Sequence, residues 1–177
     1  MRVSNVFAAT AVTFLVGGCA LPMGAPVAPA ASPSASPKSG AYGRTESRIF
    51  DLINAERRHQ GLAPLVYNPQ LDRMAKIQAE NMARFQKMAH TLPDAQLPTL
   101  GDRARYVGYS YGRLAENVAL GYPNAETVVE GWMNSSGHRR NILDGGVVET
   151  GIGIARSSAG GLYYCQVFGN SQKTVVY

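Results

Sequence analysis

Three side chains in this sequence have the chemistry to move protons or to hold a metal ion: His90, Glu116 and His138. Each is expected beside the end of a structural element, where residues distant in sequence can converge on one cleft. Two imidazoles and one carboxylate can hold zinc and leave one coordination position open, as in catalytic sites. The alternative is a neutral hydrogen-bonded network in which Glu116 orients a histidine tautomer and fixes loops over a cavity. The residue types leave both interpretations open.

A second candidate for chemistry is the segment from Gly108 to Gly112, which matches G-x-S-x-G, the nucleophile elbow of serine hydrolases. That motif needs a strand before it, a helix after it and a large parallel-sheet domain. Here a short predicted helix precedes the motif, and the domain is too small for that fold. We therefore interpret the segment as a glycine-rich turn.

His138 is positioned by the densest stretch of the sequence, which reads EGWMNSSGHRRNIL from residue 130 to residue 143. Before it, apolar residues recur on one face of a predicted helix with Asn124 as its N-cap: Val128, Val129, Trp132 and Met133. The run 135–137 is expected to end this helix, with glycine in the left-handed cap conformation. His138 then begins a new turn, supported by packing of Trp132 and by Asn141, which is expected to bond backbone groups of the turn.

Two helices are expected before His90. The first begins near Thr45 and closes at Gln60-Gly61. The second begins at the pair Asn68-Pro69, an N-cap followed by proline at the first helical position, and ends near Met88. Its buried face carries six residues: Leu71, Met74, Ala75, Gln78, Met82 and Phe85.

Shorter elements are expected after His90. A loop over residues 91–100 leads to a short helix that is capped by Asp102 and ended by Gly108. Residues 151–156 and 162–168 predict a β-hairpin. Within the second of these strands, Tyr163, Cys165 and Val167 share one face, so we interpret Cys165 as a small buried residue and not as a nucleophile.

The composition bounds the function classes. The chain has 177 residues, 45% of them hydrophobic and 16% charged, which suits one compact domain with additional non-domain sequence. Its net charge of +5 is scattered, apart from the pairs Arg57-Arg58 and Arg139-Arg140. We interpret these pairs as solvated helix ends; weak attraction to anionic envelope polymers or lipid head groups is the alternative. Nucleic acid is disfavoured as a partner, because no basic run is interleaved with aromatic residues.

The N-terminus has the features of an export signal over residues 1–20. Arg2 precedes an apolar stretch that is too short to span a bilayer, and LVGGC, ending at Cys19, resembles a bacterial lipobox. We expect lipidation of Cys19 and anchoring of the protein in a membrane of the bacterial envelope. Ordinary cleavage, releasing a soluble secreted or periplasmic protein, is the alternative. Residues 21–44 are rich in Pro, Ala and Ser and predict a disordered tether. With Cys165 as the only other cysteine, no disulfide framework is implied.

Four motifs together resemble the CAP superfamily, which comprises cysteine-rich secretory proteins, antigen 5 and pathogenesis-related 1. They are Met88-Ala-His90, AENVA from Ala115 to Ala119, WMNSSGHRRNIL from Trp132 to Leu143, and ETGIGI from Glu149 to Ile154. The sequence is most similar to the bacterial SCP-like extracellular branch, whose members lack the eukaryotic disulfides. The resemblance implies an α+β fold for a domain over residues 45–177. That fold is a three-layer α-β-α sandwich, with helices on both sides of a small, mainly antiparallel sheet.

The resemblance also implies a site. In that family a central cavity is lined by two histidines and two acidic residues, and His90, Glu116 and His138 match three of these positions. The second acid of many eukaryotic members falls at Ser135 in this chain, so the acidic pair is incomplete unless Glu130 or Glu149 completes it. Some members bind divalent metals. The same three residues are therefore the candidate ligands for an ion such as zinc, although no cofactor is certain.

The leading functional expectation is an exported CAP-domain module that binds or interacts at the bacterial cell envelope without strong catalysis. Its partner would be an envelope lipid, glycan or protein. The alternative is a metal-assisted hydrolase of peptide or peptidoglycan bonds that uses His90, Glu116 and His138. Hydrolysis requires a polarising group and a base within hydrogen-bond reach of one water, whereas a binding module requires only an open groove.

Overall fold

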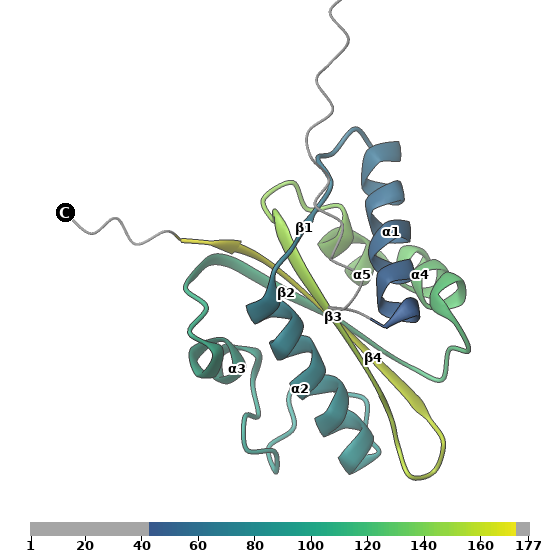
Figure 1. The fold of residues 1–177 in the computed structure, drawn as a ribbon, viewed down its shortest axis with the longest axis vertical. Helices are drawn as coiled ribbons and strands as arrows, with labels where there is room; N and C mark the ends of the chain where they lie inside the picture. The colour runs from purple at the N-terminus through teal and green to yellow at the C-terminus, as the bar shows by residue number, and fades with distance from the viewer. Residues whose placement is uncertain (1–42, 173–177) are drawn as a thin grey trace, which may run out of the picture. The chain divides into compact units, whose positions relative to one another are not determined.

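A four-stranded β-sheet separates two layers of helices in the computed structural model, which describes residues 43–172 (Figure 1). Its strand order is β1-β3-β4-β2, formed by Val66–Tyr67, Glu149–Arg156, Leu162–Ser171 and Tyr111–Leu120. β1 pairs parallel with β3, and the other pairs are antiparallel. β2 therefore forms one edge of the sheet. The expected signal, the lipidation site at Cys19 and the expected tether up to residue 42 lie outside the described residues and stay predictions, whereas Arg44, the last residue of the expected tether, begins the first helix.

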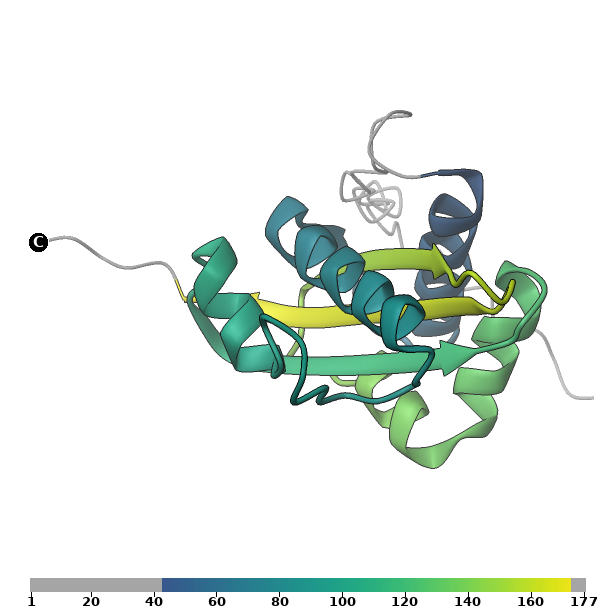
Figure 2. The same ribbon diagram turned by 90° about the horizontal axis from the view of Figure 1, so that it is seen from below.

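Each face of the sheet has its own apolar core. On one face lie α1 (Arg44–His59), α4 (Ala125–Asn134) and α5 (Ser136–Ile142). On the other lie α2 (Pro69–Phe85) and α3 (Leu100–Val107). Figure 2 shows the strands running between α2 and the α4–α5 pair. The predicted three-layer α-β-α sandwich with a mainly antiparallel sheet is confirmed. Within residues 43–172, no helix is long and apolar enough to cross a membrane.

α2 lies directly against β3, because two glycines in that strand leave room for it. A Cβ atom at Gly151 or at Gly153 would overlap the backbone of α2 near Asp72 or Ala75, respectively. α2 begins as predicted, with the Asn68 side chain accepting hydrogen bonds from the backbone N–H groups of the next turn. It ends at Phe85, earlier than the predicted end near Met88, because Gln86 adopts a left-handed conformation with φ of 50°.

The turn before His138 differs from the prediction. α4 is capped by Asn124 and ends at Asn134, but no left-handed glycine ends it. Ser135 instead adopts an extended conformation, with φ of −96° and ψ of 119°, and serves as both the C-cap of α4 and the N-cap of α5. Gly137 and His138 consequently lie inside α5. The predicted burial of Trp132 is confirmed, and its Nε1 donates to the Val118 carbonyl at 3.3 Å.

Two further predictions about local structure are corrected. The N-cap of α3 is Thr99, whereas Asp102 occupies the third helical position and completes a capping box with it. Arg57, expected in solvent, is only 2% exposed and donates to backbone carbonyls of the chain. The interpretation of residues 108–112 as a glycine-rich turn is correct only for residues 108–110, because strand β2 already begins at Tyr111. Gly108 ends α3 with φ of 70°.

Candidate functional site

The candidate site is built on β2, a strand that was not predicted from the sequence. Glu116 lies in its interior and not at an element end, as had been expected. Alternate residues of a strand point to opposite faces of a sheet. Leu114 and Val118 belong to the core beneath α2, and Ala115 and Ala119 belong to the core beneath α4. Glu116 therefore faces the α2 layer, and the following residue, Asn117, faces the α4 layer.

Both carboxylate oxygens of Glu116 are engaged. The side chain is 2% exposed, and its Oε2 accepts from Arg103 Nη2 at 2.6 Å and from the Cys165 thiol at 3.4 Å. Its Oε1 lies 3.0 Å from His90 Nδ1, which donates to it. Burial, together with the charge of Glu116, raises the pKa of the Cys165 thiol. The prediction that Cys165 is a small buried residue is thus confirmed.

Arg103 links this carboxylate to the segment that carries His90. The guanidinium is fully buried, and its Nη1 donates to Gln78 Oε1 at 2.5 Å. Gln78 Nε2 in turn donates to the Ala89 carbonyl at 2.5 Å, one residue before His90. Arg103 was not among the site residues predicted from the sequence. The available signal was Gln78, a polar residue on the buried face of α2, which needs a partner because buried polar groups are almost always hydrogen-bonded.

On the opposite face, an asparagine pair ties α5 to β2. Asn117 Nδ2 donates to the His138 carbonyl at 3.2 Å. Asn141 Nδ2 donates to Asn117 Oδ1 at 2.9 Å and to the Glu116 carbonyl at 3.3 Å. The prediction that Asn141 bonds the backbone of its own turn is therefore wrong, since it bonds the neighbouring strand. β2, the edge strand of the sheet, therefore contacts segments from both helical layers: the segment of His90 on one face and α5 on the other.

The two histidines have opposite electrostatic environments. The His90 side chain is 58% exposed, and its hydrogen bond to Glu116 raises its pKa, outweighing partial burial. Partial burial lowers the pKa of His138, and positive charge on His90 lowers it further. The structure thus brings His90 and Glu116 into direct contact and places His138 within electrostatic range of His90. The His138 ring has no hydrogen bond to any residue between 43 and 172.

Neither candidate for the second acid joins this group. Glu149 lies at the start of β3, which β4 separates from β2, and its Oε2 accepts from the Tyr109 hydroxyl at 2.7 Å. Glu130 is exposed on α4. The departure from the family pattern at Ser135 is therefore not compensated by either glutamate.

The arrangement does not fit a metal ion ligated by Glu116. Its two oxygens already bond His90 and Arg103, and the buried guanidinium places a positive charge beside them. Among residues 43–172, no group of three or more His, Cys, Asp or Glu side chains is placed to hold a metal. Zinc binding by His90, Glu116 and His138 stays a prediction without support from this geometry.

A sheet covered by helices on both faces, with two histidines and a buried glutamate gathered at its edge, defines an α+β domain of the CAP type. The profile described as "CAP: Cysteine-rich secretory protein family" matches residues 50–168, more than half of the chain. The chain belongs to this family.

Bacterial proteins are among its relatives. The chain is 37% identical to uncharacterized protein YkwD of Bacillus subtilis over 117 residues. The aligned region makes up 64% of this chain and 44% of the relative. An extracellular protein containing a SCP domain from Bacillus anthracis superposes with a TM-score of 0.66 and 28% identity, over 72% of this chain and 40% of that one. An outer surface protein of Borrelia burgdorferi shares the fold, with a TM-score of 0.64 and 21% identity over 70% and 90% of the two chains.

The matched region is therefore less than half the length of the two Bacillus proteins. Together, the fold and the family match identify this chain as a CAP-domain protein, and its bacterial relatives include one that is described as extracellular.

Proposed function

We propose that this protein is exported, is anchored in the envelope through lipidated Cys19, and acts there as a binding or interaction module. Its partner is an envelope lipid, glycan or protein. Similarity to the extracellular SCP-domain protein of Bacillus anthracis supports the location. The lipobox-like ending LVGGC supports the anchor.

The observation that carries the binding role is the state of Glu116. A general base must lie within hydrogen-bond reach of the proton that it takes, and the Glu116 side chain is only 2% exposed. Here both oxygens are hydrogen-bonded, and the carboxylate forms a buried ion pair with Arg103. Such a group holds the surrounding segments in place, while His90 remains exposed to meet a ligand. His138 is half-buried beside it.

The alternative is hydrolysis of peptide or peptidoglycan bonds. One observation favours it: the pKa values of His90 and His138 are shifted in opposite directions, as in pairs that divide the roles of acid and base. This role would also require a polarising group, and the engaged state of Glu116 weighs against that residue supplying it. We therefore rank binding above hydrolysis.

The test is co-sedimentation of the full-length chain with isolated bacterial cell walls and with membrane vesicles, combined with analysis of released fragments. His90→Ala and His138→Ala are expected to reduce retention, whereas His59→Ala, which removes an exposed histidine at the end of α1, serves as the matched control. Equal retention of all three variants would contradict the proposed binding surface. Release of wall fragments that depends on His138 would reverse the ranking and establish hydrolysis.

The anchor is tested separately with Cys19→Ala. This variant is expected to lose membrane association in cells while the purified chain keeps its binding to isolated walls or vesicles. Unchanged membrane association of Cys19→Ala would refute lipid anchoring without affecting the binding role.

A further inference from the structure

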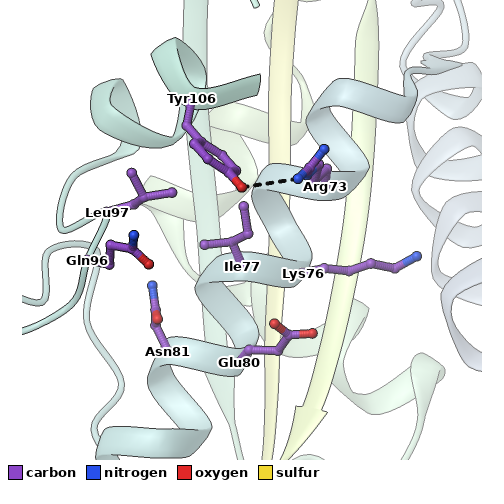
Figure 3. Close-up of a pocket in the computed structure, with 8 residues that line it drawn as sticks. All are labelled: Arg73, Lys76, Ile77, Glu80, Asn81, Gln96, Leu97 and Tyr106. Carbon is purple, nitrogen blue, oxygen red and sulfur yellow. Dashed lines mark hydrogen bonds between the residues drawn. The ribbon is translucent and has the colours of Figure 1, made fainter. Parts of the chain in front are cut away.

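A pocket of about 460 Å³ lies between the outer side of α2 and the segment that leads into α3 (Figure 3). Eight residues line it: Arg73, Lys76, Ile77, Glu80, Asn81, Gln96, Leu97 and Tyr106. None of these eight bonds His90, Glu116 or His138. The volume is within the usual range for small-molecule sites. This α2 pocket is therefore separate from the candidate site at the sheet edge.

An aromatic ring and a guanidinium form one end of the α2 pocket. Tyr106 is 55% exposed, so part of its ring is open to a ligand. The Arg73 Cζ atom lies 5.1 Å from the centre of its ring, and Arg73 Nη2 donates to its hydroxyl at 3.2 Å. These contacts hold the guanidinium in a defined position against the ring.

Arg73 is available to an anionic ligand. It forms no ion pair with any residue in the described part of the chain, and a guanidinium has five N–H donors, most of which remain unused here. Lys76, by contrast, is already paired with Asp72 at 2.9 Å, and Figure 3 shows it pointing away from Tyr106. The cation offered to a ligand is thus a single planar group, which favours bidentate recognition of a carboxylate.

The opposite end of the α2 pocket offers neutral hydrogen-bonding groups. The side-chain amides of Asn81 and Gln96 lie close together in Figure 3, and neither bonds another residue within 43–172. Each amide has two donors and one acceptor. The Glu80 carboxylate adds acceptors and repels strongly anionic polymers. Between the two ends, Ile77 and Leu97 provide apolar surface.

The pocket continues past Tyr106. A second pocket of about 440 Å³ is lined by Gln96, Leu97, Pro98, Asp102, Arg105 and Tyr106, so three residues are shared between the two. Tyr106 therefore stands between two adjoining hollows, and a ligand of more than one unit can occupy both.

We propose that the α2 pocket binds an N-acetylated oligosaccharide in which one sugar carries a carboxylate. The carboxylate pairs with Arg73, the apolar face of a pyranose ring packs on Tyr106, and acetamido and hydroxyl groups bond the amides of Asn81 and Gln96. An isolated carboxylate fits the lone guanidinium, and the neutral sugar groups fit the two free amides. The inference rests on the proposed function only in that the ligand is an envelope component.

The test is calorimetric titration of the full-length chain with two probes. One is the disaccharide of N-acetylglucosamine and N-acetylmuramic acid, which carries a lactyl carboxylate, and the other is N,N′-diacetylchitobiose, which lacks it. Because a charge-assisted hydrogen bond contributes about 1.5–3 kcal/mol, the wild-type chain is expected to bind N,N′-diacetylchitobiose about tenfold more weakly or worse.

Two variants and a matched control locate the contacts. Arg73→Gln is expected to bind the two probes equally, and Tyr106→Ala to weaken both by about tenfold. Arg84→Gln removes the same charge from the same helix, at a position packed on Phe85 outside the α2 pocket, and is expected to bind as wild type. The proposal is overturned if Arg73→Gln and Arg84→Gln bind the acidic disaccharide alike, if the wild type binds neither probe, or if a sugar-free acidic peptide shows the same dependence on Arg73.

Failure of the α2 pocket proposal is distinguishable from failure of the proposed function. If neither disaccharide binds but His90→Ala still loses envelope retention, the α2 pocket assignment falls and the binding role at the sheet edge stands. If the acidic disaccharide binds with the expected dependence on Arg73 while His90→Ala is retained as wild type, the α2 pocket stands and the sheet-edge surface falls.

Discussion

Each face of the sheet holds one buried arginine, and the two are used differently. On the α1 face, Arg57 is 2% exposed and donates only to backbone carbonyls. Its four acceptors are Ala63 at 2.9 Å, Ile142 at 2.7 Å, Asp144 at 2.9 Å and Val147 at 3.3 Å. On the α2 face, Arg103 is fully buried and donates to two side chains, Gln78 and Glu116.

The difference separates a structural role from an electrostatic one. Arg57 joins the chain after α1 to the loop that follows α5, and its partners are neutral dipoles. Burial lowers the pKa of Arg57, and the nearby charge of Asp144 opposes that effect. Arg103 instead supplies the counter-charge for a buried carboxylate that in turn bonds His90. The loss of Arg57 leaves carbonyls without a donor, whereas the loss of Arg103 leaves an uncompensated charge.

The largest predicted effect is that of Arg103→Met. Removing one partner of a buried ion pair typically costs about 3–5 kcal/mol of unfolding free energy, because the other charge stays buried without compensation. Urea unfolding of the single variants and of the double variant with Glu116→Gln measures this coupling. The double variant is expected to be more stable than Arg103→Met alone, by about 1 kcal/mol or more. Strictly additive destabilisation would contradict an electrostatic role for Arg103.

A smaller effect is predicted for Arg57→Met. It removes four hydrogen bonds, but the exposed position of Ala63 and the partly exposed position of Asp144 let water replace some of them. We expect a loss of about 2–4 kcal/mol in the same urea experiment. The matched cycle uses Asp144→Asn, since that carboxylate bonds Arg113 and not Arg57. Coupling in this cycle as large as that between Arg103 and Glu116 would remove the distinction between the two arginines.

Neither buried arginine could be predicted from local sequence. Asn68, Asn124 and Gly108 were correctly identified as helix caps, because a cap depends on residues within one turn. Burial of Arg57 depends on a carbonyl 85 residues away in sequence, that of Ile142. An arginine at a helix end is usually solvated, and the local pattern contains nothing to indicate otherwise.

The strand that carries the site was missed for a related reason. β2 reads YGRLAENVAL, and the polar Glu116 and Asn117 occupy both faces in its middle. This breaks the alternation of apolar and polar residues that indicates a strand. Both residues are satisfied by groups from other elements, Arg103 in α3 and Asn141 in α5. The family motifs found the three candidate site residues and Asn141, but Arg103, which pairs with Glu116, became visible only in the fold.

The smallest predicted effect is the pH-dependent stabilisation by His90. It tests whether the charge of buried Arg103 influences the pKa of this exposed histidine. The hydrogen bond to Glu116 raises the pKa of folded His90, so the folded state binds this proton more tightly than the unfolded state, whose histidine pKa is about 6.5. The stabilisation by His90, relative to His90→Gln, is therefore fully present below that value and lost as the pH rises through the folded pKa. Because the side chain is mostly exposed, we expect less than about 1 kcal/mol, measured by urea unfolding between pH 5 and 8.

For His138, the stability of the wild type relative to His138→Gln is expected to change with pH in the opposite direction. Burial lowers the pKa of His138, so the unfolded state binds this proton more tightly, and the stability of the wild type relative to His138→Gln rises with pH up to the unfolded pKa. The decisive comparison repeats the His90 measurement in three variant backgrounds: Arg103→Met, Arg103→Lys and Arg57→Met. The Arg103 charge holds the pKa of His90 down, so Arg103→Met should enlarge the pH dependence, provided that the variant folds, and Arg103→Lys should leave it nearly unchanged. Arg57→Met should leave it unchanged. An equal response to the loss of either arginine would show that the pH dependence follows global stability and not the charge beside Glu116.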